Sequence, residues 1–252
     1  EYDTNNQLTK VTCREGNASG PIKYTQENTY NYDGQRISKS DNGVTTNYYY
    51  QGGVLLYTTD NSGNKTSQNV VGPQENVIAT IRYEEDGQHA YFYNKDSRTS
   101  VTNVVDESGS SVVSYRYDDY GSTTRYGDKD FYNEICYTSG VYDELTELYY
   151  LNARYYNPES ATFITRDSYQ GRIQEPQTLN RYVYCLNNPM SRVDPSGHDS
   201  YVFSISDFKI ESSGIQNILN KYYNKKSHLK VVNSKQRFKK EWNAMMGKKL
   251  NV

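Results

Sequence analysis

The first 130 residues consist of short runs in which aromatic or apolar residues alternate with polar ones. A period of two places alternate side chains on one face of a β-strand, so each run predicts a strand with one apolar face. Clusters of Gly, Asn and Asp separate the runs, and these residues favour tight turns. The pattern predicts an antiparallel β meander. The clearest predicted strands are Val44–Tyr50, Val54–Tyr57, Val101–Val105 and Val112–Tyr117, with turns at Asp41–Gly43, Gln51–Gly53, Asp60–Asn64 and Asp106–Gly109.

A degenerate repeat underlies this alternation, with copies at Tyr2–Leu8, Tyr30–Ile37 and Tyr115–Gly121. In each copy, alternating aromatic and polar residues run into a turn. The recurring Tyr rings could form a stacking surface for sugars or bases, or they could pack strand against strand. Packing is the favoured interpretation, because the rings recur with the period of the fold instead of clustering at one place.

The pattern changes from residue 199 onward. Ser200–Ser206 and Leu229–Val232 read as strands, and each is followed by a helical stripe of apolar residues. The order βαβα predicts half of a small three-layer α/β domain with parallel strands. Two strands seldom stand alone, so we expect the tail, residues 199–252, to be truncated or to complete its sheet elsewhere. The two stripes are Ile215, Ile218, Leu219 and Tyr222, and then Phe238, Trp242 and Met245.

Composition argues against disorder and divides the chain in two. The mean hydropathy is −0.95, but 28 residues are Tyr, which buries a ring while its hydroxyl stays hydrated or bonded. From Asp199 onward there are 11 Lys or Arg against 4 Asp or Glu, a net charge of +7, whereas residues 1–198 carry −9. A basic tail fits contact with nucleic acid, and it fits solvated helix faces equally well.

Several classes of site find no support in the sequence. Cys13, Cys136 and Cys185 are scattered, and without a Cys-x-x-Cys pair or a Cys/His cluster we expect no disulfide framework, metal or cofactor. No run approaches the ~18 apolar residues of a membrane span. The chain starts inside a repeat, at Glu1, which leads us to expect the C-terminal piece of a longer protein whose export signal lies elsewhere.

The stretch from Tyr149 to Gly197 is the most distinctive part of the chain, and it closely resembles the Rhs repeat-associated core of Rhs and YD-repeat proteins. In that family a β-rich shell precedes the core, and a variable effector follows its closing Asp-Pro-x-Gly turn. The resemblance implies a repeat sheet at 1–130, a core at 131–198 and an effector region at 199–252. We expect so short a shell segment to form an open, curved sheet. The matching residues are Tyr149–Leu151, Ala153–Pro158, Phe163–Ile164, Asp167, Asn180–Tyr184, Asn187–Pro189 and Val193–Gly197.

The resemblance also implies self-cleavage by a pair of carboxylates just after the core. Asp167 and Asp194 are the candidates, and Arg154 matches the Arg that supports the site. Two nearby carboxylates cannot both ionise cheaply, so one keeps a proton while the other acts as base on a water. Structural alternatives remain open: Asp194–Gly197 is a good turn on its own chemistry, and Arg154 with Asp167 could be a salt bridge that locks the core. Enzymatic activity therefore stays undecided at this point.

Two positions depart from the family pattern. His198 stands where a bulky apolar residue usually precedes the cut, so the predicted scissile bond is His198–Asp199. Ser168 stands where a Pro often follows the first Asp. An imidazole would have to fill a pocket of apolar type, which bears on the efficiency of cleavage.

Three functions remain in view. The first is the C-terminal segment of a bacterial polymorphic toxin, secreted or held at the cell surface, whose shell and core encapsulate and present the effector. The second adds self-cleavage and a nuclease-type effector, as in wall-associated contact-inhibition toxins. The third is an adhesive or glycan-binding β-repeat protein, as a similar shell serves in the teneurins. Expected partners are the rest of the Rhs shell, a cognate immunity protein and nucleic acid bound by the tail.

Overall fold

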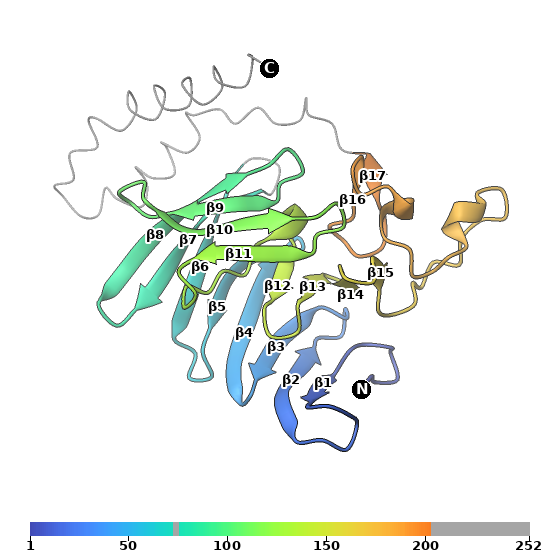
Figure 1. Cartoon of the computed structure of the whole chain (residues 1–252), viewed down its shortest axis with the longest axis horizontal. Helices are drawn as coiled ribbons and strands as arrows, with labels where there is room; N and C mark the ends of the chain where they lie inside the picture. Colours follow the sequence, from blue (N-terminus) through green and yellow to red (C-terminus); the bar gives the residue numbers. More distant parts are fainter. Residues whose placement is uncertain (73–75, 203–252) are drawn as a thin grey trace, which may run out of the picture. The chain divides into compact units, whose positions relative to one another are not determined.

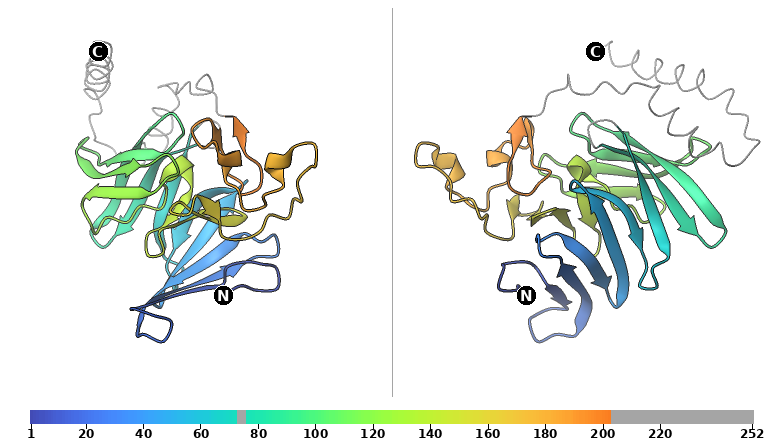
Figure 2. Two further views of the ribbon diagram at one scale, coloured as in Figure 1. Left: turned by 45° about the vertical axis from the view of Figure 1, so that its right-hand side comes forward. Right: turned by 180° about the vertical axis from the view of Figure 1, so that it is seen from behind.

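The structure, a computed structural model, describes residues 1–72 and 76–202. Its main feature is a twisted sheet of eleven strands, in which each strand pairs antiparallel with the next along the chain (Figure 1). Figure 2 shows that the sheet is curved, and its two edge strands are not paired with each other. The strands are β1 Lys10–Arg14, β2 Ile22–Tyr30, β3 Arg36–Asp41, β4 Val44–Gln51, β5 Val54–Thr59, β6 Lys65–Val71, β7 Val77–Glu84, β8 Gly87–Lys95, β9 Val101–Val105, β10 Ser111–Tyr117 and β11 Thr123–Gly127.

The repeat has a structural cause in one loop that recurs six times in the described residues. An Asp or Asn side chain accepts hydrogen bonds from the backbone N–H groups two and four positions later, at 2.8–3.1 Å. The residue three positions later has a positive φ, which Gly and Asn adopt at least cost. Each predicted repeat copy places its Tyr-Asp or Tyr-Asn step at such a loop. The loops start at Asp3, Asn31, Asp60, Asp96, Asp106 and Asp118.

A smaller sheet follows in the chain and packs against the first through aromatic rings. Tyr149 and Tyr156 of this sheet are fully buried with Tyr184, which precedes η4 (Cys185–Asn187), and the Tyr156 and Tyr184 ring centroids lie 4.0 Å apart. Tyr137 connects this cluster to Tyr117 of the large sheet, with centroids 5.6 Å apart. Such contacts support the packing interpretation of the Tyr repeat. The smaller sheet consists of β12 Val141–Asp143, β13 Leu148–Leu151, β14 Arg154–Asn157 and β15 Thr162–Phe163, and a separate pair consists of β16 Arg192–Val193 and β17 Tyr201–Val202. Three short 3-10 helices occur in the same part of the chain: η2 Tyr137–Ser139, η3 Pro176–Thr178 and η4 Cys185–Asn187.

A buried ionic cluster joins the two sheets. Asp143 at the end of β12 accepts hydrogen bonds from Arg36 of β3 and, at 2.9 Å, from Gln26 of β2. Lys39 lies 3.4 Å from the other Asp143 oxygen. The Arg36 and Asp143 side chains are 0% exposed, and the Arg36 guanidinium lies 4.5 Å from the Tyr48 ring centroid. These side-chain contacts therefore fix the position of the smaller sheet against β2 and β3.

The predicted mainly β fold and its long antiparallel meander are confirmed, and no α-helix occurs in residues 1–72 or 76–202. Most of the predicted α/β tail lies outside the described residues. The part that is described, Tyr201–Val202, pairs antiparallel with β16 through a short connecting loop. The predicted parallel arrangement of this strand with Leu229–Val232 lies outside the described residues. The predicted boundaries at 130 and 198 stay predictions.

Candidate functional site

One strand and two loops bring the predicted site residues together. Arg154 opens β14 immediately after the tight turn that joins it to β13, where Leu151 pairs with Arg154. Asn152 in that turn has a φ of 56°, which an Asn side chain tolerates better than most. Asp167 lies in the loop after β15, and Asp194 directly follows β16. The rigid hairpin thus presents one cation to two carboxylates from separate loops.

The Arg154 guanidinium is the centre of the site. Its Nη2 lies 2.8 Å from Asp167 Oδ2 and 3.9 Å from Asp194 Oδ2, so both carboxylates lie within 4 Å of one nitrogen. Its Nε donates a hydrogen bond to the carbonyl oxygen of Gly197. All four residues are buried. The planar, multi-donor guanidinium suits this role, because it engages several oxygens in fixed directions.

Two further residues hold the guanidinium and its partner in place. The Arg154 Cζ stacks 3.6 Å from the centroid of the Phe163 ring, and Nη1 donates to the Arg181 carbonyl at 3.1 Å. The backbone N–H of Asp167 donates to the same Arg181 carbonyl at 3.0 Å, and the Arg181 guanidinium donates back to the Asp167 carbonyl. Arg181 therefore fixes the loop that carries Asp167.

The turn after Asp194 is closed by its own carboxylate. Asp194 Oδ1 accepts hydrogen bonds from the Gly197 N–H at 2.9 Å and the Ser196 hydroxyl at 3.3 Å. The Ser196 carbonyl accepts from the Ala153 N–H at 3.1 Å. Gly197 has a φ of 72°, and a Cβ there would run into the Leu151 carbonyl oxygen. Only glycine lets the chain lie this close to the β13–β14 hairpin.

The two groups with perturbed pKa values are a carboxyl and its cation. Burial raises the pKa of Asp194 above its ordinary value, against the opposing charge of Arg154 and the N–H of Gly197. Burial lowers the pKa of Arg154, and the two carboxylates oppose that shift. A carboxyl with a raised pKa beside a second carboxyl is the member of such a pair that keeps a proton.

His198 does not enter an apolar pocket. Its side chain is 46% exposed, and its Nδ1 lies 3.1 Å from Asp167 Oδ1. The backbone N–H groups of His198 and Asp199 each lie 3.2 Å from the Ser196 Oγ. The N–H of the predicted scissile peptide is thus linked to Asp194 through the Ser196 hydroxyl, and the side chain before that peptide contacts Asp167.

The match to known proteins agrees with this architecture. A family model described as "Teneurin YD-shell" matches residues 1–190. The chain belongs to the teneurin YD-shell family. This YD-shell chain is also 34% identical over 174 residues, 68% of its length, to the tRNA nuclease WapA of Bacillus subtilis strain 168. It is equally similar to the tRNA3(Ser)-specific nuclease WapA of Bacillus spizizenii. It spans only 7% of the length of either relative.

Solved structures share the fold of this YD-shell chain. TcdB2-TccC3 without its hypervariable C-terminal region matches with a TM-score of 0.60 at 22% identity, covering 78% of this chain and 10% of that one. A Tc holotoxin pore of Photorhabdus luminescens matches with a TM-score of 0.58 at 23% identity, with the same coverage. The predicted resemblance to YD-repeat shells is therefore confirmed, and at this identity the structures establish the fold alone.

The YD-shell structure thus brings Arg154, Asp167 and Asp194 together, with the His198 imidazole in contact with Asp167. The two structural alternatives are visible too, since Arg154 and Asp167 form an ion pair and Asp194 closes a turn. A catalytic role stays a prediction. Sequence reasoning missed Arg181 and Phe163 as supports of the site, and their place inside the matching core motifs was the available signal.

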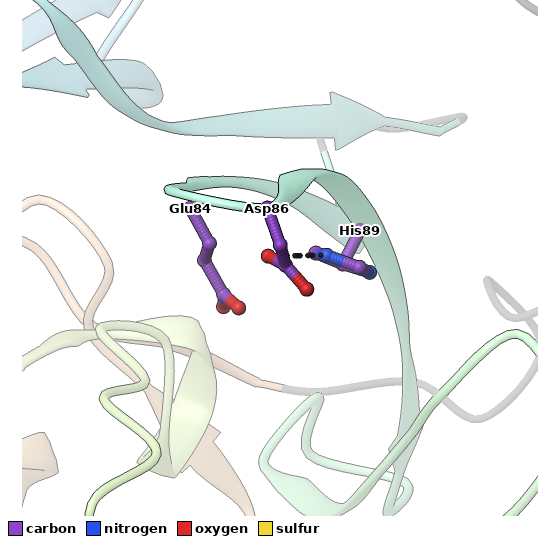
Figure 3. A group of neighbouring side chains, drawn as sticks. All are labelled: Glu84, Asp86 and His89. Atoms are coloured by element: carbon purple, nitrogen blue, oxygen red, sulfur yellow. Dashed lines mark hydrogen bonds and ion pairs between the residues drawn. The ribbon is translucent and has the colours of Figure 1, made fainter.

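Elsewhere in the YD-shell chain, Glu84, Asp86 and His89 lie together at the β7–β8 turn, with ligand atoms within 4.8 Å of one another (Figure 3). His89 Nε2 lies 3.0 Å from Asp86 Oδ1, and this hydrogen bond raises the pKa of His89. Glu84 and Asp86 are exposed and His89 is partly exposed, so the group is an ordinary surface ion pair with a neighbouring carboxylate.

The three cysteines of the YD-shell chain are free thiols. Burial raises the pKa of both Cys136 and Cys185 to about 12, which keeps them protonated and unreactive at neutral pH. No helix in residues 1–72 or 76–202 has the length and hydropathy that a bilayer crossing requires.

Proposed function

We propose that this chain is the C-terminal part of the shell of a bacterial Rhs/YD-repeat polymorphic toxin. The eleven-stranded sheet and the core enclose and present a variable effector that begins near Asp199. The family match supports this proposal, as does the short span of the chain along its relatives, which fits a partner in the rest of the shell. The protein acts outside the cell or at its surface, and a cognate immunity protein protects the producer.

We further propose that the core cuts its own chain between His198 and Asp199. One observation carries the proposal: a single buried guanidinium contacts both candidate carboxylates and the Gly197 carbonyl, one residue before the predicted bond. A salt bridge that only stabilised the core would need neither a second carboxylate nor a hydrogen bond from Arg154 to the Gly197 carbonyl in the closing turn.

The roles follow from the electrostatics. Asp194, whose pKa burial raises, holds the proton and donates it to the carbonyl oxygen of His198. Asp167 accepts a proton from a water whose oxygen bonds to the His198 carbonyl carbon. The C–N bond then breaks as the proton held by Asp167 passes to the amino nitrogen of Asp199, and one hydroxyl proton of the intermediate returns to Asp194, leaving a carboxyl group on His198. Arg154 keeps the two carboxylates and the substrate segment aligned throughout.

The test is an electrophoretic comparison of the purified chain with Asp167→Asn and Asp194→Asn, both close to isosteric. We expect two fragments from the wild type and one intact band from each variant. Asp33→Asn, at an exposed turn, is the matched control and should be cut like the wild type. An uncut wild type, or cleavage that survives in either site variant, would refute the proposed role of the carboxylates.

A nuclease-type tail is the second candidate. The names of two relatives specify tRNA cleavage, and residues 199–252 carry a net charge of +7. Basic residues supply the sequence-independent part of nucleic-acid binding. Incubating the chain with total tRNA should yield discrete tRNA fragments if the tail is such an enzyme. Intact tRNA, at a chain concentration where released tail is detected, would exclude this candidate.

A further inference from the structure

The imidazole of His198 contacts Asp167, the carboxylate that the proposed cleavage needs as its general base. Asp167 Oδ2 is engaged by Arg154 at 2.8 Å, while Oδ1 receives the Tyr169 N–H at 3.0 Å and faces the His198 Nδ1 at 3.1 Å. The Asp167 side chain is only 10% exposed. Both of its oxygens therefore already have partners, and the imidazole covers part of what would otherwise face solvent.

A general base must contact the water whose proton it takes, directly and within about 2.6–3.2 Å. Asp194 offers no substitute, because its Oδ1 accepts from Gly197 and Ser196 and its Oδ2 lies toward Arg154. Of the contacts that Asp167 makes, the one with His198 is the easiest to break. Arg154 is buried and the Tyr169 donor belongs to the backbone, whereas the His198 side chain is 46% exposed and free to turn outward.

We infer that His198 is a rate-setting residue of self-cleavage: its imidazole holds Asp167 in a resting arrangement, and water reaches the carboxylate only after it leaves. The inference rests on the proposed cleavage at His198–Asp199. In this chain His198 replaces the apolar residue of the family pattern, and this replacement therefore sets the rate of cleavage. The residue whose carbonyl is attacked also controls access to the base.

The experiment follows the rate of self-cleavage in the wild type and in His198→Ala, His198→Leu and His198→Asn. Ala and Leu remove the contact to Asp167, so both should be cut about 10- to 100-fold faster, the range that one hydrogen bond to a charged group corresponds to. Asn retains a side-chain donor and should stay near the wild-type rate. His89→Leu removes an exposed His–Asp contact away from the site and is the matched control, with an unchanged rate.

The variants separate the competing explanations. If only Leu accelerates cleavage, an apolar pocket prefers Leu and the resting contact has no role. Equal rates in all variants, or slower cleavage in Ala and Leu, would likewise overturn the inference while leaving the proposed function intact. Absence of cleavage in every variant, the wild type included, would instead refute the proposed function itself.

Discussion

The buried ion pair between the two sheets gives the sharpest prediction about stability. Asp143→Asn keeps the shape of the side chain but removes the negative charge that faces Arg36 and Lys39. Arg36 and Asp143 have no exposed side-chain surface, so water cannot replace the lost partner. Removing one member of a buried pair costs about 3–5 kcal/mol, which is a large share of the ~5–15 kcal/mol stability of a typical domain.

Urea unfolding of the chain would measure this loss as a fall in the free energy of unfolding. Glu27→Gln is the control, since Glu27 pairs with Lys10 at 2.6 Å but the two side chains are 57% and 35% exposed. Exposed pairs contribute about 0–1 kcal/mol, so this variant should unfold close to the wild type. An Asp143→Asn variant that unfolds within ~0.5 kcal/mol of Glu27→Gln would refute the view that this cluster holds the core to the sheet.

The same ion pair predicts that the free energy of unfolding falls at low pH. Burial alone would raise the pKa of Asp143, but Arg36 and Lys39 more than offset it and hold the pKa below its ordinary value. A carboxyl with a depressed folded-state pKa contributes stability above its unfolded pKa of ~3.9 and loses it as the pH falls through the folded value. The wild type should therefore lose stability below about pH 4, and Asp143→Asn should show a flatter decline there.

Two further predictions concern the candidate site and a partly buried lysine. Gly197→Ala should disrupt the closing turn and abolish self-cleavage, because a Cβ there meets the Leu151 carbonyl; Gly63→Ala, with a similar positive φ and open space around it, should cost only ~1–2 kcal/mol and leave cleavage intact. Cleavage in Gly197→Ala at the wild-type rate would contradict that account. Desolvation lowers the pKa of Lys95 to about 7, whereas a lysine in the unfolded chain has a pKa of ~10.4. Between these two pH values the unfolded chain binds more protons than the folded chain, so stability should rise with pH over that window. Melting temperatures at pH 7 and pH 9 should differ less in Lys95→Met than in the wild type, and equal slopes would argue against a buried amine.

Local structure was predictable because its causes are local. The alternation at Val44–Tyr50 and Val54–Tyr57 predicted strands that the structure contains as β4 and β5. The turn residues were readable for the same reason, although the side chain that closes the second repeat loop is Asn31 and not the more obvious Asp33.

Long-range pairing was not predictable from pattern. Arg36 and Asp143 lie 107 positions apart, and no pattern in either segment predicts that the two side chains form an ion pair. The meeting of Asp167 with Asp194, 27 positions apart, came from the family resemblance and not from spacing. The contact between His198 and Asp167 was missed, because the family pattern suggested an apolar pocket where the structure has a half-exposed imidazole.

The intact mass of the C-terminal fragment tests the central claim most directly. A fragment whose mass corresponds to residues 199–252, absent from Asp167→Asn and Asp194→Asn, is the predicted result. It would identify both the bond and the two carboxylates that cut it. A single mass for the whole chain in the wild type, or a fragment that begins at another residue, would contradict the account of a core that cuts between His198 and Asp199.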